Sequence, residues 1–262
     1  MNIELVHNKE VLYEFLQKEA GLQIYLTGDL DDFFWPKTCW YALREKGKIR
    51  SVALLYAGMI PPTLLCFQKR DSHYAIRLLL ELKPLLPARF YAHLGEGYAD
   101  VFKRENIAEH YGLNYKMVLH KRIQFSGDNS IKMLGIDDLP GLLKLYSEAY
   151  PANWFDSRML ESGKYFGYIV NDELAGVAGI HVYSAKYKVA ALGNITTHPE
   201  FRKQGIGYKL TAALCADLQQ NVDVIGLNVR SDNEYAICLY KKLGFEVEGI
   251  YEECLIKNEL ST

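Results

Sequence analysis

The stretch that decides the fold is Phe201-Arg202-Lys203-Gln204-Gly205-Ile206-Gly207. It follows a strand-like run that ends at His198-Pro199, and it precedes a helix-spaced apolar pattern from Leu210 to Leu218. Glycines let a backbone approach a ligand closely, and a helix N-terminus adds unpaired N–H groups with a partial positive charge. With Arg202 and Lys203 at its mouth, the loop predicts a binding site for the pyrophosphate of a ligand.

Two better-known phosphate motifs fit this loop poorly. A P-loop requires G-x-x-x-x-G-K-[ST], and neither the spacing nor the Lys-Ser/Thr pair is present. A dinucleotide fingerprint requires a third glycine where Leu210 stands, and it follows the first strand of a βαβ unit rather than hairpin-like strands. A basic turn that only caps a helix is a further interpretation of the loop taken alone.

A second segment with polar residues relevant to ligand binding runs from Asn228 to Phe245. Ser231 and Glu234 have the spacing of a capping box, and Gly244 is a typical helix stop. An apolar helix face with a polar residue at each end suits an extended, partly polar ligand arm, although an isolated tyrosine more often belongs to the core. At i, i+3, i+4 and i+7 spacing this face carries Asn233, Ala236, Ile237 and Tyr240.

Together these two segments resemble the GCN5-related N-acetyltransferase (GNAT) family over residues 131 to 257. Arg202, Gly205 and Gly207 match its R/Q-x-x-G-x-G/A signature, and Asn233 to Phe245 matches its second conserved block. The resemblance implies an α/β fold with a central mixed sheet flanked by helices. It also implies an N-acetyltransferase that takes its acyl group from acetyl-CoA, a co-substrate, and needs no metal.

The resemblance further implies roles for individual residues. Tyr240 is expected to be the general acid, because a phenol with a pKa of about 10 can protonate the departing thiolate. The end of the strand is expected to splay from its neighbour, to contact the pantetheine arm and to polarise the thioester carbonyl. The loop amides are expected to bind the pyrophosphate. The expected coenzyme-binding residues are Ile195, Thr196, Thr197, Arg202, Lys203, Gln204, Gly205, Ile206, Gly207, Tyr208 and Asn233.

The general base has no evident candidate in the strand before the loop. Residues Tyr187 to Thr197 contain no carboxylate, unlike the strand of many family members. A path through water, or no dedicated base, is equally compatible with the sequence, so no base is assigned. The same gap leaves open a coenzyme-binding module without catalysis, and a different acyl donor would use the same site. The ionisable candidates are His181, His198, Glu148 and Glu200.

The first half of the chain predicts a degenerate copy of the same fold. The polar stretch Ser126 to Ser130 reads as a linker, which gives domains at residues 1–125 and 131–262. A hairpin pattern over Trp40 to Tyr56 resembles the later one over Tyr165 to Tyr183, although two unrelated domains would also fit. Where the phosphate loop should stand, Phe67-Gln68-Lys69-Arg70-Asp71-Ser72-His73 has no glycine, so this copy is expected to lack a coenzyme site.

Composition restricts the remaining possibilities. The 262 residues carry a formal net charge of -2, which argues against a nucleic-acid binder. The five cysteines are scattered and predict buried free thiols rather than a disulfide framework or a zinc site. No signal peptide or membrane-length apolar run is visible, so a cytoplasmic location is expected. The acceptor is expected to be an amine on a small molecule or peptide, and the sequence does not specify the oligomeric state.

Overall fold

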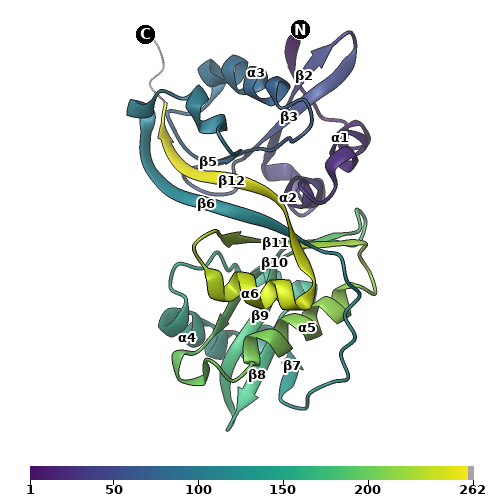
Figure 1. Cartoon of the computed structure of the whole chain (residues 1–262), viewed down its shortest axis with the longest axis vertical. Helices are drawn as coiled ribbons and strands as arrows, with labels where there is room; N and C mark the ends of the chain where they lie inside the picture. Colours follow the sequence, from purple (N-terminus) through teal and green to yellow (C-terminus); the bar gives the residue numbers. More distant parts are fainter. Residues whose placement is uncertain (259–262) are drawn as a thin grey trace. The chain divides into compact units, whose positions relative to one another are not determined.

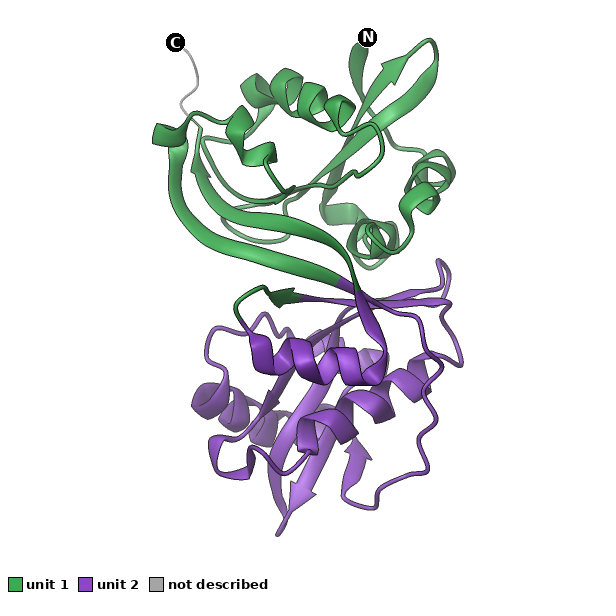
Figure 2. Ribbon diagram, in the orientation of Figure 1, with its two compact units in different colours: residues 1–116, 229–232, 247–262 green, residues 117–228, 233–246 purple. Residues whose placement is uncertain are grey.

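The computed structural model describes residues 1–258 and divides into two compact units. Unit 1 comprises Met1–Lys116, Val229–Asp232 and the described residues from Val247, and unit 2 comprises Met117–Asn228 and Asn233–Glu246 (Figure 2). The units therefore differ from the expected boundaries, because unit 1 ends its first segment at Lys116 rather than at residue 125 and also takes Val229–Asp232 and most of the last strand. No helix within residues 1–258 combines the length and the apolar character of a membrane span.

Unit 1 is a mixed sheet with helices (Figure 1). Its strand order is β1-β2-β3-β4-β5-β12-β6, and neighbours from β1 to β4 run antiparallel, whereas β4 and β5 run parallel. The elements in chain order are β1 (Asn2–Leu5), α1 (Lys9–Leu16), α2 (Ile24–Gly28), β2 (Thr38–Glu45), β3 (Lys48–Tyr56), β4 (Thr63–Cys66), α3 (His73–Leu82), β5 (Arg89–Gly95) and β6 (Ile107–Leu119), whose last residues enter unit 2.

Unit 2 repeats this arrangement in the order β11-β10-β9-β8-β7. Neighbours from β7 to β10 run antiparallel, whereas β10 and β11 run parallel. The elements are β7 (Ile131–Met133), α4 (Leu139–Ala149), β8 (Phe166–Val170), β9 (Glu173–Ser184), β10 (Val189–Thr197), α5 (Ile206–Leu218), β11 (Val224–Arg230), α6 (Glu234–Leu243) and β12 (Phe245–Lys257), which continues into unit 1.

The two halves thus share strand order, strand directions and the helix between the fourth and fifth strands. Both predicted hairpins are present, as β2 with β3 and β8 with β9. One element is missing from the first half: α6 follows β11, whereas β5 is followed only by short 3₁₀ helices at Tyr98–Val101 and Arg104–Asn106. The first copy therefore lacks the counterpart of the helix that carries Tyr240.

Burial explains why the C-terminal strand belongs to unit 1. Cys254 and Ile256 of β12 are 1% and 0% exposed, and they lie in one apolar cluster with Phe90 of β5 and Leu78 of α3. Burying one aliphatic side chain stabilises a fold by about 1.5–3 kcal/mol, so the strand is an integral part of this core.

The structure resolves the expected burial of the cysteines and the role of one aromatic segment. Cys66, Cys215 and Cys254 are buried free thiols as expected, but Cys39 and Cys238 are exposed, so the prediction of burial is wrong for these two. They stand on β2 and α6, two elements that each keep one side toward solvent. The aromatic segment from Phe33 to Pro36 has a packing role, because the Trp35 ring stacks on the buried Trp40 at 6.1 Å between ring centroids.

Candidate active site

The site begins where β10 leaves the regular ladder. β10 and β11 pair in parallel from Val189–Val224 to Leu192–Leu227, and both strands continue beyond this register. Against β9, the register of β10 shifts between Gly193 and Thr196. A bulge of this kind frees backbone groups from the ladder and bends the strand. The segment that holds Ile195, Thr196 and Thr197 is therefore separated from β11, as the sequence led us to expect.

Asn194 holds the bulge in place. Its φ of 54° is left-handed, a region that asparagine tolerates better than most residues, and it is 2% exposed. Its Oδ1 accepts a hydrogen bond from the Trp154 amide at 3.2 Å, and its Nδ2 donates to the Tyr165 hydroxyl at 2.9 Å. The Tyr146 hydroxyl donates to its carbonyl oxygen at 2.9 Å. The bulge is thus fixed by two tyrosine hydroxyls and one backbone amide from segments outside β10.

No pattern in the sequence predicted a role in the site for these supporting residues. Tyr146 lies in α4, Tyr165 directly precedes β8, and Trp154 lies in the connection between them. The available signal was the polar, turn-favouring Asn194 inside an otherwise apolar strand, because such a residue often marks a bulge or a left-handed backbone.

The glycine loop lies at the surface, and its amides lack acceptors within the described chain. Lys203 and Gly205 have φ values of 65° and 77°, and both residues are exposed. Across residues 1–258, the amide groups from Lys203 to Tyr208 donate to no acceptor. Arg202 is anchored to the strand end, because its Nε donates to the carbonyl oxygen of Thr197 at 3.1 Å. Consecutive free N–H groups at the start of α5 form an anion-binding concavity.

The strand end, the loop and α6 converge at Gly207. A Cβ added to Gly207 would lie 3.4 Å from Leu239 Cδ1 of α6 and 3.6 Å from Thr197 Oγ1 of β10. At Gly176 of β9, an added Cβ would lie 3.1 Å from Ile206 Cγ2 of α5. Small residues at these points let α5 approach both the sheet and α6 closely. Segments far apart in the sequence therefore meet around the first turn of α5.

The N-cap of helix α6 lies two residues later in the chain than predicted. Asn233, not Ser231, is the N-cap: its Oδ1 accepts from the Ala236 amide at 3.1 Å, so the predicted capping box is wrong. Asn233 takes this role because it directly precedes the first helical residue, Glu234. Gly244 ends the helix with a φ of 95°, as predicted. Within the described chain, the exposed side-chain NH₂ of Asn233 has no acceptor and is available to a ligand.

Tyr240 lies on the half-buried face of α6. Burial, reinforced by the neighbouring Cys215 and Tyr150, raises the pKa of Tyr240 above its usual value. Its ring packs edge-on against Phe245 at 5.8 Å between ring centroids. A phenol with a raised pKa stays protonated at neutral pH, so Tyr240 retains the proton that a general acid has to donate.

The candidate bases are placed very differently. The His181 ring lies against Gly193, where an added Cβ would be 2.3 Å from it, and its Nε2 is 3.2 Å from Asn194 Oδ1. Burial lowers the pKa of His181, which favours the neutral imidazole. His198 instead pairs with Glu148 at 3.4 Å, and Glu200 is exposed. Of these residues, His181 is the one that contacts the bulge.

One group of side chains has the composition of a metal site. The ligand atoms of His110, Glu252 and Cys254 lie within 4.8 Å of one another in unit 1, and His110 forms an ion pair with Glu252 at 3.2 Å. None of the expected site residues takes part in this group.

Comparison with known proteins agrees with this geometry. The family model of the acetyltransferase (GNAT) family matches residues 136–245. The [ribosomal protein bS18]-alanine N-acetyltransferase of Escherichia coli K12 is 32% identical over 122 residues, which cover 45% of this chain and 80% of that protein. The L-methionine sulfoximine/L-methionine sulfone acetyltransferase of Pseudomonas aeruginosa is 28% identical over 142 residues, 46% of this chain and 81% of that protein.

Solved structures extend the similarity to the whole chain. A tandem GNAT protein from the clavulanic acid biosynthesis pathway is 15% identical, covers 100% of both chains and has a TM-score of 0.59. A putative GNAT acetyltransferase from Novosphingobium aromaticivorans is 20% identical over 79% of this chain and 88% of its own, with a TM-score of 0.61.

The chain therefore belongs to the GNAT family of acyl-CoA-dependent N-acetyltransferases. The predicted fold, a mixed α/β sheet in two tandem GNAT-like domains, is confirmed.

Proposed function

We propose that this enzyme transfers the acetyl group of acetyl-CoA to a primary amine, with Tyr240 as general acid. The observation that carries the proposal is the convergence of the free loop amides, the bulged end of β10 and helix α6 around Gly207. The amides from Lys203 to Tyr208, with Arg202, bind the pyrophosphate. Ile195, Thr196 and Thr197 contact the pantetheine arm, and Asn233 contacts the arm or the phosphates.

The reaction proceeds by direct transfer. The amine nitrogen bonds to the carbonyl carbon of the thioester, and a backbone amide at the end of β10 stabilises the negative charge on the oxygen. When the intermediate collapses, the C–S bond breaks and the sulfur leaves with its electron pair. Tyr240 donates its proton to this sulfur, and the proton lost by the amine returns to the phenolate through water.

The names of two relatives support a proposal for the acceptor class. One acts on an alanine of a ribosomal protein and the other on amino-acid analogues. We therefore propose an α-amino group, carried by a peptide that starts with alanine or by a free amino-acid derivative.

The test is acetyl-CoA binding by calorimetry, followed by release of free thiol with a panel of amines. The panel contains an alanine-initiated peptide, methionine sulfone and a simple alkylamine. We expect binding in the micromolar range and thiol release that depends on the first two. An absence of binding at high micromolar acetyl-CoA would refute the proposal, and release no faster than hydrolysis would refute the transferase step. Faster release with a longer acyl-CoA would show that the acyl donor is not acetyl-CoA, and would leave the proposed reaction unchanged.

A further inference from the structure

Unit 1 contains a pocket at the position that corresponds to the coenzyme cleft of unit 2. The parallel strands β4 and β5 pair up to Cys66 and Leu94, and the chain then diverges into the segments that start at Phe67 and Gly95. On the other side, β12 pairs with β5 only from Tyr251 onward. The pocket, with a volume of about 410 Å³, lies among these ends, and ligands of open α/β sheets bind at such carboxyl ends of strands.

The place of a phosphate in this copy is occupied by the protein itself. The Glu19 carboxylate accepts hydrogen bonds from the Lys69 amide at 3.1 Å and from the Arg70 amide at 2.8 Å. These amides belong to the segment that replaces the glycine loop. Because a carboxylate already satisfies them, a pyrophosphate has no free donors here and would be repelled by the negative charge. The cleft remains, but it is not a phosphate site.

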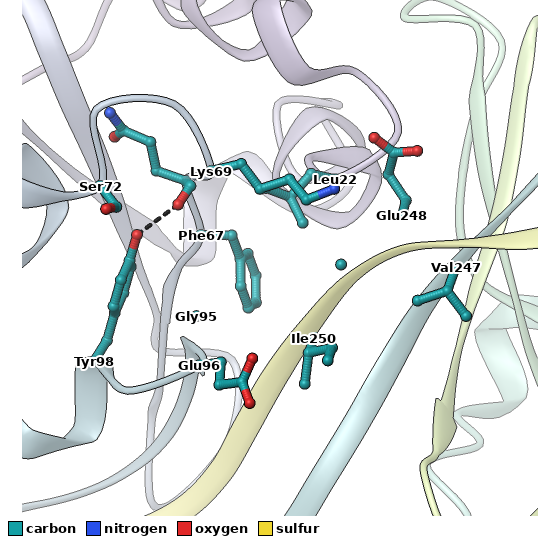
Figure 3. A pocket seen from close by; sticks show the side chains of 12 residues that line it. Leu22, Phe67, Lys69, Ser72, Gly95, Glu96, Tyr98, Val247, Glu248 and Ile250 are labelled. Atoms are coloured by element: carbon teal, nitrogen blue, oxygen red, sulfur yellow. Dashed lines mark hydrogen bonds between the residues drawn. The ribbon is translucent and has the colours of Figure 1, made fainter.

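The pocket walls combine apolar surface with an excess of negative charge. Figure 3 shows Phe67 and Ile250 near Glu96, with Glu248 on the far side of the pocket. The charged side chains of the lining are two carboxylates and one ammonium group, that of Lys69, so the lining carries one excess negative charge. The apolar surface comes from the side chains of Leu22, Phe67, Val247 and Ile250.

The other polar groups near the pocket are already engaged. The Tyr98 hydroxyl donates to the carbonyl oxygen of Gln68 at 2.5 Å. The Lys116 ammonium lies 3.8 Å from the centre of the Phe67 ring but is only 3% exposed, and it interacts electrostatically with the buried Asp29. Among the charged side chains that line the pocket, the two carboxylates of Glu96 and Glu248 outnumber the ammonium group of Lys69, so the pocket favours a cation.

We propose that unit 1 binds a small organic ammonium compound with an apolar body in this pocket. The apolar part lies against Phe67 and Ile250, and the ammonium group is attracted by the carboxylates of the lining, Glu96 and Glu248. This binding site is separate from the proposed transfer site, and it needs neither acetyl-CoA nor Tyr240.

The probe is 2-phenylethylamine, titrated by calorimetry into the full chain without an acyl donor. Its neutral analogue 2-phenylethanol and the anion 3-phenylpropanoate report the charge requirement. We expect the amine to bind at least about tenfold more tightly than the anion, because the carboxylates attract the ammonium group and repel the anion. Equal or tighter binding of the anion, or no binding of the amine, would overturn the proposal.

Substitutions locate the binding. The double variant Glu96→Gln/Glu248→Gln keeps the shape of both side chains and should weaken amine binding about tenfold or more. Glu14→Gln, an exposed carboxylate of α1 outside the pocket, is the matched control and should change nothing. An unchanged affinity in the double variant would place the amine elsewhere, for example in the acceptor site of unit 2. Acetyl-CoA binding, measured separately, fails only if the proposed function is wrong.

Discussion

The Tyr146 hydroxyl donates a hydrogen bond to the carbonyl oxygen of Asn194 at 2.9 Å, which ties helix α4 to the bulge of β10. A bulge that rested on its own backbone would be free to relax into a regular ladder with β11. Because side chains from α4 and from the segment before β8 hold both the carbonyl and the side chain of Asn194, the open end of β10 is preorganised before any ligand binds.

Replacing Asn194 tests this preorganisation. Asn194→Ala forces a left-handed φ on alanine and leaves the Tyr165 hydroxyl with one partner fewer, so we expect the free energy of unfolding to fall by about 2–4 kcal/mol. Asn194→Gly removes the side chain without the backbone strain and should lose about 1–2 kcal/mol less. Chemical denaturation gives both values. If the two variants were equally stable, the backbone strain assigned to this position would be wrong.

Tyr240→Phe should separate binding from chemistry. The ring and its packing against Phe245 remain, so the Kd for acetyl-CoA should change less than twofold, while kcat should fall about 10²-fold because the proton donor is lost. Tyr235→Phe is the matched control, since this tyrosine of the same helix is 67% exposed. Calorimetry and steady-state thiol release provide the two readouts. An undiminished kcat in Tyr240→Phe would remove this residue from the mechanism.

Two glycines with the same backbone angle distinguish a binding role from a folding role. Gly205 and Gly47 both have a φ of 77°, and an added Cβ at either meets no atom within 4 Å. Alanine at either position should therefore lower the free energy of unfolding by about 1–2 kcal/mol. Only Gly205→Ala should also weaken acetyl-CoA binding, by about five- to tenfold, because its Cβ stands among the amides that receive the pyrophosphate. A similar loss of affinity in Gly47→Ala would show that affinity follows stability alone.

His181 predicts a pH dependence of stability with a definite sign. Burial lowers the pKa of His181 from 6.5, so the folded state binds its proton less readily than the unfolded chain does. Its contribution to stability is complete above pH 6.5 and is lost as the pH falls through the lowered pKa. His181→Gln keeps an amide that can donate to Asn194 but does not titrate. We expect denaturation between pH 5 and 8 to show a shallower decline toward acid in the variant, and an unchanged slope would contradict this assignment.

What the sequence determined by itself were the features encoded locally. These features are the loop from Phe201 to Gly207, the helix that ends at Gly244 and the two hairpins, which all depend on residues close together in the chain. The loop and the helix also carry the signatures whose resemblance to the GNAT family implied a mixed α/β fold and an acyltransferase site. The choice of Asn233 over Ser231 as N-cap shows the limit, since two cap-forming residues two positions apart compete for one backbone position.

Only the tertiary structure decided which distant residues act together. Tyr146 and Asn194 are 48 positions apart. The amides of Lys69 and Arg70 donate hydrogen bonds to the carboxylate of Glu19, which stands 50 and 51 positions earlier. The last strand joins the core of the first unit because Cys254 and Ile256 are buried there. Such contacts are selected by the burial of apolar surface and the pairing of polar groups in the folded chain as a whole, and no local pattern specifies them.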